Sequence, residues 1–348
     1  MTSNKTLIFK KPPTGFPVAG EHIAVEDRPL DLDAPAPAGG LVLELLYASF
    51  DPYLRGRMRD ARADKSYSSP FAPGDPIVNS AVARVRQSGA AGFAAGDLVT
   101  AFVPIAEYAV VGDAAAARVR RVENPHGLDL GLFLGPLGMP GLTAYASLRE
   151  FGALRRGETL FVSSAAGAVG QVVGALAKRE GLRVVGSVGS DAKRDYVTRE
   201  LGFDAAFNYR TESPAAALPR LAPDGVDVYF ENVGGEHLEA AIDNMNERGR
   251  ILVCGMISVY NQPPAERYGI KNLHLLIGKL ITMRGFLVGQ AELGPAYAER
   301  HQRDVQAWLA DGSFPARLHV TDGIDRAADG LIGIFHGDNF GKAVVKIR

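Results

Sequence analysis

The fold of this chain is indicated most strongly by Thr159-Leu-Phe-Val-Ser-Ser-Ala-Ala-Gly-Ala-Val-Gly170, which Gln171-Val-Val-Gly-Ala-Leu-Ala-Lys178 follows. The first part is typical of a strand of β-branched and aromatic residues that ends in a turn of very small ones. In the second part apolar residues recur at helical spacing. Gly181 would end that helix, and Leu182-Arg-Val-Val-Gly186 predicts the next strand. The segment therefore predicts a complete βαβ unit of the expected ~30 residues.

The turn in this unit is suited to a phosphate-bearing ligand. A strand–turn–helix aims backbone N–H groups and the positive end of a helix at one point, which suits a diphosphate. Gly167 and Gly170 would let the backbone approach that ligand. The first small position, usually Gly in G-x-G-x-x-G, is Ser164 here. A tight turn without a ligand is the alternative interpretation, but the complete βαβ context favours dinucleotide binding.

The end of the second strand indicates which dinucleotide is bound. A preference for NAD usually requires Asp or Glu about 20 residues past the turn, to hold the ribose 2′-hydroxyl. That neighbourhood has Ser187 at the strand end and no acid, while Asp191 stands where we expect a helix N-cap. Lys193 and Arg194 would suit a 2′-phosphate, although an ordinary solvated helix face has the same pattern. The missing acid favours NADP.

Size, charge and cysteine content exclude several classes of protein. The chain has 348 residues, of which 47% are apolar, as in a globular protein of two domains. Its formal charge of −1 favours neither nucleic acid nor an anionic membrane. We expect no signal sequence and no membrane span. The one cysteine, Cys254, excludes an internal disulfide and a four-cysteine zinc site, and it points to a reducing compartment, so we expect a cytoplasmic protein.

Two regions of different organisation follow from the spacing of predicted elements. Residues up to about 125 look all-β, with strands predicted at Leu41–Ala48 and Gly96–Val103. From about 127 to 292, strands alternate with helices, which implies a parallel doubly wound sheet. Its further strands are predicted at Ala205–Asn208, Val226–Glu231, Gly249–Gly255 and Ile281–Phe286.

The remaining residues, 293–348, predict an amphipathic helix near His301–Ala310 and a closing strand at Lys342–Ile347. We expect this segment to return to the first domain. The return would leave a cleft between two domains, where ligand sites tend to lie.

This organisation resembles the medium-chain dehydrogenase/reductase superfamily. Within it, the chain is similar to the zinc-independent branch of prostaglandin reductases and alkenal double-bond reductases, which includes the bacterial curcumin reductases. The first 40 residues and Ile77–Gly96 match poorly, and Asn79-Ser-Ala-Val-Ala83 stands where a glycine-rich strand is usual. The matching motifs are Asp51-Pro-Tyr-Leu-Arg-Gly-Arg-Met58, Gly138-Met-Pro-Gly-Leu-Thr-Ala-Tyr145, Ala165-Ala-Gly-Ala-Val-Gly170, Gly189-Ser-Asp-Ala-Lys193, Phe207-Asn-Tyr209, Phe230-Glu-Asn-Val-Gly-Gly235, Cys254-Gly-Met-Ile-Ser-Val-Tyr-Asn261 and Gly337-Asp-Asn-Phe-Gly-Lys342.

The resemblance implies an α/β fold with a GroES-like β-rich catalytic domain, residues 1–126 plus 293–348, and a Rossmann NADP-binding domain, residues 127–292. It also implies NADPH as the cofactor. Lys193 and Tyr209 would hold the 2′-phosphate, and Thr143 would lie near the nicotinamide amide. The diphosphate would lie on Ala165, Ala166, Gly167, Ala168, Val169 and Gly170. The rest of the cofactor would be lined by Gly189, Asn232, Cys254, Gly255, Ile257, Ser258, Tyr260, Phe286, Leu287, Val288 and Asn339.

By the same resemblance, Tyr260 faces the substrate and Tyr53 contributes. In reduction of an α,β-unsaturated carbonyl, hydride adds at the β-carbon and charge develops on the carbonyl oxygen, to which a phenol can donate a hydrogen bond. The alternative for Tyr260 is a half-buried ring that only packs, with the cofactor's ribose hydroxyl as a rival donor. Tyr53 fits a pocket wall as well as a donor.

Neither a nucleophile nor a metal site is expected. Cys254, at a strand end, is typical of a small packed residue. The 7 His residues show no metal-ligand spacing, and the chain lacks the Cys and Gly-His-Glu ligands of an alcohol dehydrogenase zinc. We therefore expect no metal.

Three functions stay open at this point. The first is an NADPH-dependent reductase of conjugated enones or enals, acting on a small molecule. The second is a quinone reductase on the same scaffold, and the third is an NADPH-binding protein without turnover. A homodimer is expected by resemblance, because Ile281–Val288 would form an apolar edge strand that can pair with its copy.

Overall fold

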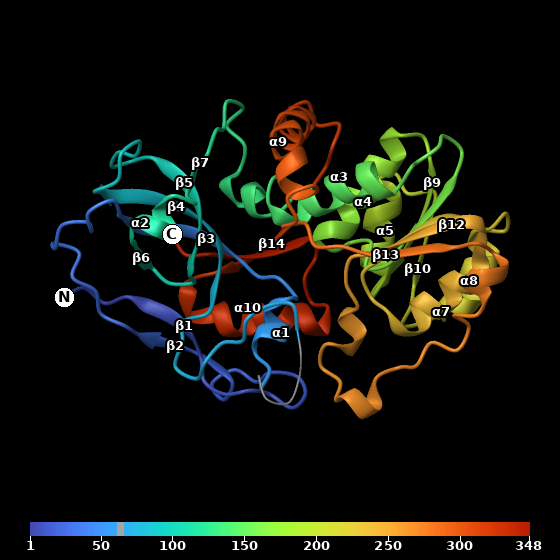
Figure 1. The fold of residues 1–348 in the computed structure, drawn as a ribbon, viewed down its shortest axis with the longest axis horizontal. Coiled ribbons are helices and arrows are strands. Elements are labelled where there is room, and N and C mark those ends of the chain that lie inside the picture. Colours follow the sequence, from blue (N-terminus) through green and yellow to red (C-terminus); the bar gives the residue numbers. More distant parts are fainter. Residues whose placement is uncertain (61–65) are drawn as a thin grey trace. The chain divides into compact units, whose positions relative to one another are not determined.

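The computed structural model describes residues 1–60 and 66–348, and its chain divides into two compact units. Unit 1 comprises Met1–Leu134 and Leu318–Arg348, and unit 2 comprises Gly135–Arg317 (Figure 1). Helix α9 (Gly294–Ala310) falls in the segment predicted to return to the first domain, yet it packs on α3 (Met139–Phe151) within unit 2. The domain bounds inferred from the sequence stay a prediction.

Unit 2 is built on a parallel sheet of the predicted doubly wound type. Among the described residues it has six strands in the order β10-β9-β8-β11-β12-β13, and every neighbouring pair is parallel. The strand order reverses between β8 and β11, and ligands of such sheets bind beside the carboxyl ends at this point. The strands are β8 (Thr159–Val162), β9 (Arg183–Val188), β10 (Ala205–Asn208), β11 (Val226–Glu231), β12 (Met245–Val253) and β13 (Thr282–Gly285).

Helices cover this sheet, with α3 and α4 above it in Figure 1 and α7 and α8 below it. The core between sheet and helices includes a stack of aromatic rings, in which Phe161 and Tyr229 lie 4.8 Å apart between centroids. The other helices of unit 2 are α4 (Ala168–Arg179), α5 (Asp191–Arg199), α6 (Pro214–Leu221), α7 (Gly235–Asn244) and α8 (Leu275–Gly278), with 3-10 turns at Ile257–Val259 and Pro264–Glu266.

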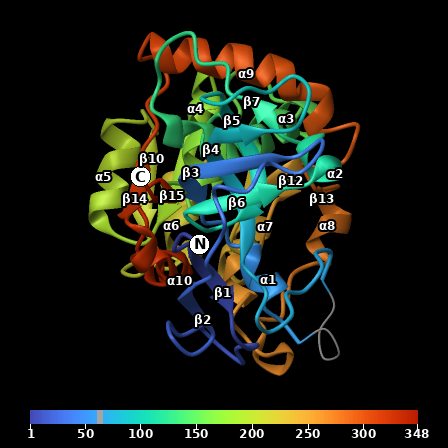
Figure 2. The same ribbon diagram turned by 90° about the vertical axis from the view of Figure 1, so that its left-hand side faces the viewer.

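Unit 1 is β-rich, as predicted. Its main sheet runs β14-β15-β3-β4-β5-β7 with β6 also on β3, and β1 pairs with β2 (Figure 2). The strands are β1 (Lys5–Phe9), β2 (Ile23–Asp27), β3 (Leu41–Ser49), β4 (Val78–Ser88), β5 (Leu98–Pro104), β6 (Tyr108–Val111), β7 (Arg120–Arg121), β14 (Leu318–Asp322) and β15 (Lys342–Lys346). The helices are α1 (Leu54–Arg57), α2 (Asp113–Ala116) and α10 (Ala327–His336), with 3-10 turns at Leu130–Leu134 and Ile324–Arg326.

The predicted return of the chain's last strand to the first domain is confirmed. Strand β15 pairs antiparallel with β3, where Val344 lies opposite Ser49. The pairing brings residue 342 beside residues 49–51, about 290 positions earlier in the chain. This contact between distant segments carries the polar chain described below.

Several predicted elements differ from the observed ones at their ends, among them three in unit 2. Strand β12 begins at Met245 rather than Gly249, and β13 is shorter than Ile281–Phe286. Helix α9 begins at Gly294, well before His301. Its first turn contains Pro295, a residue that is favoured at the start of a helix because its fixed φ suits that position. Element ends are the least certain part of a prediction from pattern, since tertiary contacts extend or trim them.

Candidate functional site

The turn between β8 and α4 leads directly into the N-terminus of a helix. Ser164 stands in the left-handed region with φ +54°, where Gly is usual, and Gly167 N donates to Ser164 O over 2.9 Å. Gly167 precedes α4 with extended backbone and has no side-chain cap among the described residues. The first N–H groups of a helix lack partners within it, so an anion can accept from them here.

Gly170 allows this turn to close. A Cβ at Gly170 would lie 2.3 Å from Ser164 O and 2.8 Å from Ala165 Cα, distances that no side chain tolerates. The backbone of Ala165 in turn donates to Ser187 O over 2.9 Å, which ties the turn to β9. The glycine predicted for close approach is therefore required by the protein's own backbone, whether or not a ligand is present.

The residues predicted for the 2′-phosphate are Lys193 on α5 and Tyr209, which follows β10. A Cβ at Gly189 would lie 3.0 Å from the Tyr209 hydroxyl, so the phenol lies against the end of β9. Lys193 lies in the first turn of α5. Ser187 is fully buried, and its Oγ has no hydrogen-bond partner among the described residues. With no carboxylate at the strand end to bind a 2′-hydroxyl, this region fits a dinucleotide that carries a phosphate there.

One prediction at this helix is wrong by one residue. The N-cap of α5 is Ser190, whose Oγ accepts from Lys193 N over 3.3 Å, and not Asp191. Asp191 is the first residue of the helix, where the helix dipole favours an acid. Its carboxylate accepts from Arg194 Nη1 over 2.9 Å. Arg194 also pairs with Asp195 at 3.3 Å. The basic pair therefore divides, with Arg194 bound to acids of its own helix.

At the end of β11, a buried acid shapes the loop that contains Asn232. Glu231 is fully buried, and its Oε1 accepts from Val233 N over 2.6 Å, Gly234 N over 2.9 Å and the Tyr229 hydroxyl over 2.8 Å. Burial raises the pKa of Glu231, and these donors oppose that rise. The sequence analysis did not single out Glu231. The signal for it was an acid at the end of an otherwise apolar strand.

Asn232 is held by the neighbouring strand. Its Nδ2 donates to Ser163 O over 2.8 Å, and its backbone N donates to Ser163 Oγ over 2.9 Å. Ser163 Oγ in turn donates to Glu231 Oε1 over 3.1 Å. Strands β8 and β11 are thus joined at the point where the strand order reverses.

The run from Cys254 to Tyr260 lies beside the same loop. Cys254 N and Gly255 N both donate to Glu231 O, and Ile257 N donates to Asn232 O over 3.1 Å. A Cβ at Gly255 would lie 3.0 Å from the Tyr260 hydroxyl, so this phenol lies over the carboxyl end of β12.

The environment of Cys254 argues against a nucleophile. Burial and the Glu231 carboxylate raise the pKa of the Cys254 thiol to about 12, and the thiol therefore stays protonated near neutral pH.

Three other predicted cofactor residues of unit 2 make hydrogen bonds or ring contacts with neighbouring residues of the same unit. Thr143 Oγ1 donates to Met139 O over 2.7 Å, one turn earlier in α3. The Phe286 ring packs on Phe151 at 5.9 Å and on Phe230 at 6.3 Å. Val288 O accepts from the N-terminus of α9.

Two predicted site residues belong to unit 1. The Tyr53 hydroxyl donates to Asn79 Oδ1 over 2.9 Å, and Asn339 Nδ2 donates to Gly341 O over 2.8 Å. Asn79 was noted in the sequence only as a departure from the family motif, and its contact with Tyr53 was not foreseen. That contact is tertiary, since 26 residues separate the two in the chain.

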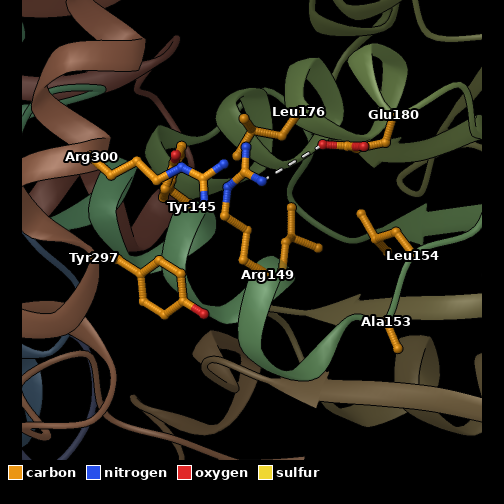
Figure 3. A pocket seen from close by; sticks show the side chains of 9 residues that line it. Tyr145, Arg149, Ala153, Leu154, Leu176, Glu180, Tyr297 and Arg300 are labelled. Atoms are coloured by element: carbon orange, nitrogen blue, oxygen red, sulfur yellow. Dashed lines mark ion pairs between the residues drawn. The ribbon is translucent and has the colours of Figure 1, made fainter.

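A separate pocket of about 380 Å³ opens on unit 2 and contains none of the predicted site residues (Figure 3). Arg149 lies 3.9 Å from Glu180, and its guanidinium lies 4.4 Å from the centroid of the Tyr145 ring. Arg149 Nε has no hydrogen-bond partner among the described residues, but the ring face lies against it. Arg300 pairs with Asp304 at 3.6 Å. The two arginines that line this pocket are thus paired with acids of the protein itself. We therefore do not place the candidate site in this pocket.

In residues 1–60 and 66–348, no group of three or more His, Cys, Asp and Glu side chains is arranged to hold a metal ion. No helix in the same residues is long and apolar enough to cross a membrane.

Comparison with known proteins yields two family models and several full-length relatives. The models described as "Zinc-binding dehydrogenase" and "N-terminal domain of oxidoreductase" match residues 168–302 and 5–119. The chain is 49% identical over 347 residues to the NADP-dependent oxidoreductase RED1 of Cochliobolus heterostrophus, covering 100% of this chain and 98% of that protein. It is 43% identical over 349 residues to the 2-alkenal reductase (NADP(+)-dependent) of Nicotiana tabacum, covering 99% and 98%.

Among solved structures, the chain is similar to CurA from Vibrio vulnificus in complex with NADPH. The TM-score is 0.90 with 33% sequence identity, and the match covers 99% of each chain.

Proposed function

Because this chain belongs to the medium-chain dehydrogenase/reductase superfamily, in its zinc-independent branch of prostaglandin, alkenal and curcumin reductases, we propose that it reduces the carbon–carbon double bond of α,β-unsaturated ketones and aldehydes. It is an NADP-dependent oxidoreductase with a GroES-like domain and a Rossmann domain. The observation that carries the proposal is the Tyr260 hydroxyl beside Gly255, at the carboxyl end of the sheet. The name of the tobacco 2-alkenal reductase supports the substrate class, and the CurA–NADPH complex supports the cofactor.

When bound, NADPH supplies the hydride that adds to the β-carbon. The small turn Ala165–Gly170 would bind its diphosphate, and Lys193 with Tyr209 its 2′-phosphate. As charge develops on the carbonyl oxygen, Tyr260 would donate a hydrogen bond to it and stabilise the enolate, which is protonated afterwards. In zinc-dependent alcohol dehydrogenases a metal ion polarises the carbonyl for attack at its carbon. Attack at the β-carbon instead spreads the charge into an enolate, which hydrogen bonds can stabilise.

The roles of the remaining residues are part of the same proposal. Thr143 would lie near the nicotinamide amide, and Tyr53 would contribute to the substrate side. The other cofactor contacts would come from Gly189, Asn232, Cys254, Gly255, Ile257, Ser258, Phe286, Leu287, Val288 and Asn339.

The test follows the hydride with NADPH deuterated at the nicotinamide C4 and an enone substrate. Label at the β-carbon of the product is expected, whereas label on a carbinol carbon would contradict the proposal. A quinone assayed in parallel separates the alternatives. Turnover of the quinone alone identifies a quinone reductase, and NADPH binding without turnover of either compound identifies a non-catalytic binder.

A tyrosine variant tests the role of the phenol. Tyr260→Phe should lower turnover ~10-fold to 1,000-fold, because one donor of several is lost, with a smaller change in cofactor affinity. The matched control is Tyr297→Phe, whose hydroxyl donates to Glu150 over 2.9 Å and lies on α9. An unchanged rate in Tyr260→Phe would leave the reaction standing and assign Tyr260 to packing.

We also propose a homodimer formed through the edge of the unit 2 sheet. Strand β13 ends that sheet, and exposed apolar side chains accompany it, among them Ile277 at 80%, Leu280 at 54% and Leu287 at 45% exposure. Such an edge is suited to pairing with its copy about a two-fold axis. Light scattering should give twice the 37.0 kDa of one chain at micromolar concentration, and Ile277→Glu should shift it to one chain. A mass near 37.0 kDa for the unaltered protein would refute the dimer.

A further inference from the structure

The side chain of Tyr209, to which we give a role at the 2′-phosphate, projects from a fixed backbone. Tyr209 directly follows β10, where Asn208 pairs with Val188 of β9, and Tyr209 N donates to Val188 O over 3.0 Å. The residue itself is 39% exposed. The sheet therefore holds its backbone, whereas an exposed side chain can occupy several rotamers. The contacts of the ring then decide where the hydroxyl points.

Two neighbours of unit 2 contact the side chain of Tyr209. One is Gly189, where a Cβ would lie 3.0 Å from the Tyr209 hydroxyl and 3.3 Å from Cζ. The other is His237 in the first turn of α7, whose ring meets the Tyr209 ring edge-on, with centroids 5.3 Å apart and an interplanar angle of 79°. Edge-to-face is a favoured geometry of aromatic pairs. Gly189 offers only backbone, so His237 supplies a side-chain contact that can hold the ring.

His237 has the properties of a packing residue and not those of a phosphate ligand. It is 6% exposed, and its Nε2 is buried without a hydrogen-bond partner among the described residues. Burial lowers the pKa of His237 from 6.5 to about 4, so the ring is neutral near neutral pH and brings no charge to a phosphate. The buried Phe207 ring lies 6.4 Å from it and nearly parallel, at 19°. His237 thus connects the core of unit 2 to the ring of Tyr209.

We propose that His237 is a positioning residue for cofactor selectivity. Its ring holds the Tyr209 ring in the rotamer that binds the 2′-phosphate, and it thereby adds to the preference for NADPH over NADH. This inference rests on the proposed function, in which Tyr209 and Lys193 bind the 2′-phosphate. Lys193 contributes a charge, whereas His237 acts through the shape of its ring and touches neither cofactor.

A purely structural role for His237 makes a different prediction. If the ring only filled space between α7 and the sheet, its loss would lower stability and would change the affinities for NADPH and NADH by the same factor. The two cofactors differ only in the 2′-phosphate. The ratio of the two affinities is therefore the decisive measurement.

The experiment titrates the full-length protein with NADPH and, separately, with NADH, and follows the fluorescence of the nicotinamide without any substrate. Tyr209→Phe should weaken NADPH about 10-fold, the worth of one hydrogen bond to a charged group, and leave NADH unchanged. His237→Leu should weaken NADPH about 3- to 10-fold and leave NADH unchanged, because the unsupported phenol makes that bond for only part of the time. His237→Phe keeps a ring and should keep both affinities within about 2-fold.

A double variant and a matched control complete the set. The NADPH affinity of His237→Leu/Tyr209→Phe should lie within about 2-fold of that of Tyr209→Phe, since His237 acts only through the hydroxyl that is already gone. The control is His301→Leu. His301 is also a buried histidine of unit 2, and its ring lies 5.5 Å from that of Tyr145 at 64°. Whatever its effect on stability, this variant should leave the ratio of NADPH to NADH affinity unchanged.

Several outcomes would overturn the inference. One is an unchanged NADPH affinity in His237→Leu, or an equal loss for NADH. Another is a loss in His237→Phe as large as that in His237→Leu, which would assign the effect to the imidazole nitrogens. A third is a double variant in which the two losses multiply. If His237→Leu does not fold, His237→Met decides in its place, because it also provides an apolar side chain without a ring.

Tyr209→Phe separates this inference from the assignment on which it rests. If Tyr209→Phe weakens NADPH and His237→Leu does not, the inference alone fails. If Tyr209→Phe leaves NADPH affinity unchanged, Tyr209 does not bind the phosphate, and both fail. The titrations contain no substrate and do not depend on turnover. A protein that shows the expected affinities but reduces no enone would therefore refute the proposed reductase and support the role of His237.

Discussion

The turn between β8 and α4 consists of backbone from one continuous segment, whereas the polar chain that ends on Tyr53 joins side chains from residues 49–53, 79 and 342. The turn depends on the absence of a side chain at Gly170, since a Cβ there would lie 2.3 Å from a backbone oxygen. The polar chain depends on every member being present, because each buried group satisfies the next. A site of the first kind is local and visible in sequence, and a site of the second kind exists only after the strands have paired.

The largest effect is expected at Lys342, which belongs to the polar chain. Lys342→Met should lower the free energy of unfolding by ~3–5 kcal/mol in denaturant titrations, because it leaves the Asp51 charge buried without its partner. Burial lowers the pKa of Lys342 and Asp51 opposes this, so the ammonium is stable there only as one of a pair. The control is Lys346→Met, at the exposed end of the same strand. Equal losses in the two variants would show that the buried pair is dispensable.

The turn should respond to a single methyl group. Gly170→Ala is expected to cost about 3 kcal/mol, seen as a ~100-fold loss of NADPH affinity, since the added Cβ displaces Ser164 and the N-terminus of α4. Gly278→Ala is the matched control, because a Cβ there meets nothing within 4 Å. Fluorescence titration with NADPH measures both. Wild-type affinity in Gly170→Ala would mean that the turn has room to move.

A substitution of Lys193, on α5, tests whether a side chain adds selectivity between NADPH and NADH to the binding by the backbone turn. Lys193→Ala should weaken NADPH by ~1.5–3 kcal/mol, roughly tenfold or more, and leave NADH nearly unchanged, since only NADPH carries the 2′-phosphate. Arg199→Ala, at the other end of α5 and 78% exposed, should change neither affinity. Equal losses for both cofactors in Lys193→Ala would show that Lys193 does not bind the phosphate.

Acid should reveal a second contrast, between the buried ion pair of Lys342 with Asp51 and two histidines that burial keeps neutral. Burial lowers the pKa of His237 and of His301, both in unit 2, from 6.5 to about 4. The unfolded chain therefore binds more protons between these values, so their contribution to stability is full above pH 6.5 and is lost as the pH falls toward 4. His237→Phe should reduce the slope of unfolding free energy in this window by ~1.4 kcal/mol per pH unit.

The control for this titration is His126→Phe, at an exposed position of unit 1. Chemical denaturation at several pH values between 4 and 7 gives each slope. A slope in His237→Phe equal to that of the unaltered protein would mean that His237 is protonated in the folded state.

Much of unit 2 could be predicted because its signals are local. The strands β10 and β11 lie where the pattern of apolar residues placed them, and the sheet is parallel as the alternation of strands and helices implied. The cap of α5 was wrong by one residue, since Ser190 and Asp191 are both good N-caps and only the backbone chooses between them.

The residues that were missed act through distant partners. Glu231 was not singled out, because its role is to accept from the loop that follows β11. Asn79 looked like a departure from a motif until the structure placed it between Asp51 and Tyr53.

From the amino-acid sequence alone follow the βαβ unit, the NADP preference and the family, since each rests on residue types at fixed short spacings, where backbone geometry leaves few choices. The direction of the Tyr53 hydroxyl, the pairing of Lys342 with Asp51 and the burial of Glu231 depend on strands that meet from remote parts of the chain. Hydrogen bonds and buried charges act over a few ångströms of space, and spacing along the chain does not specify which groups will share that space.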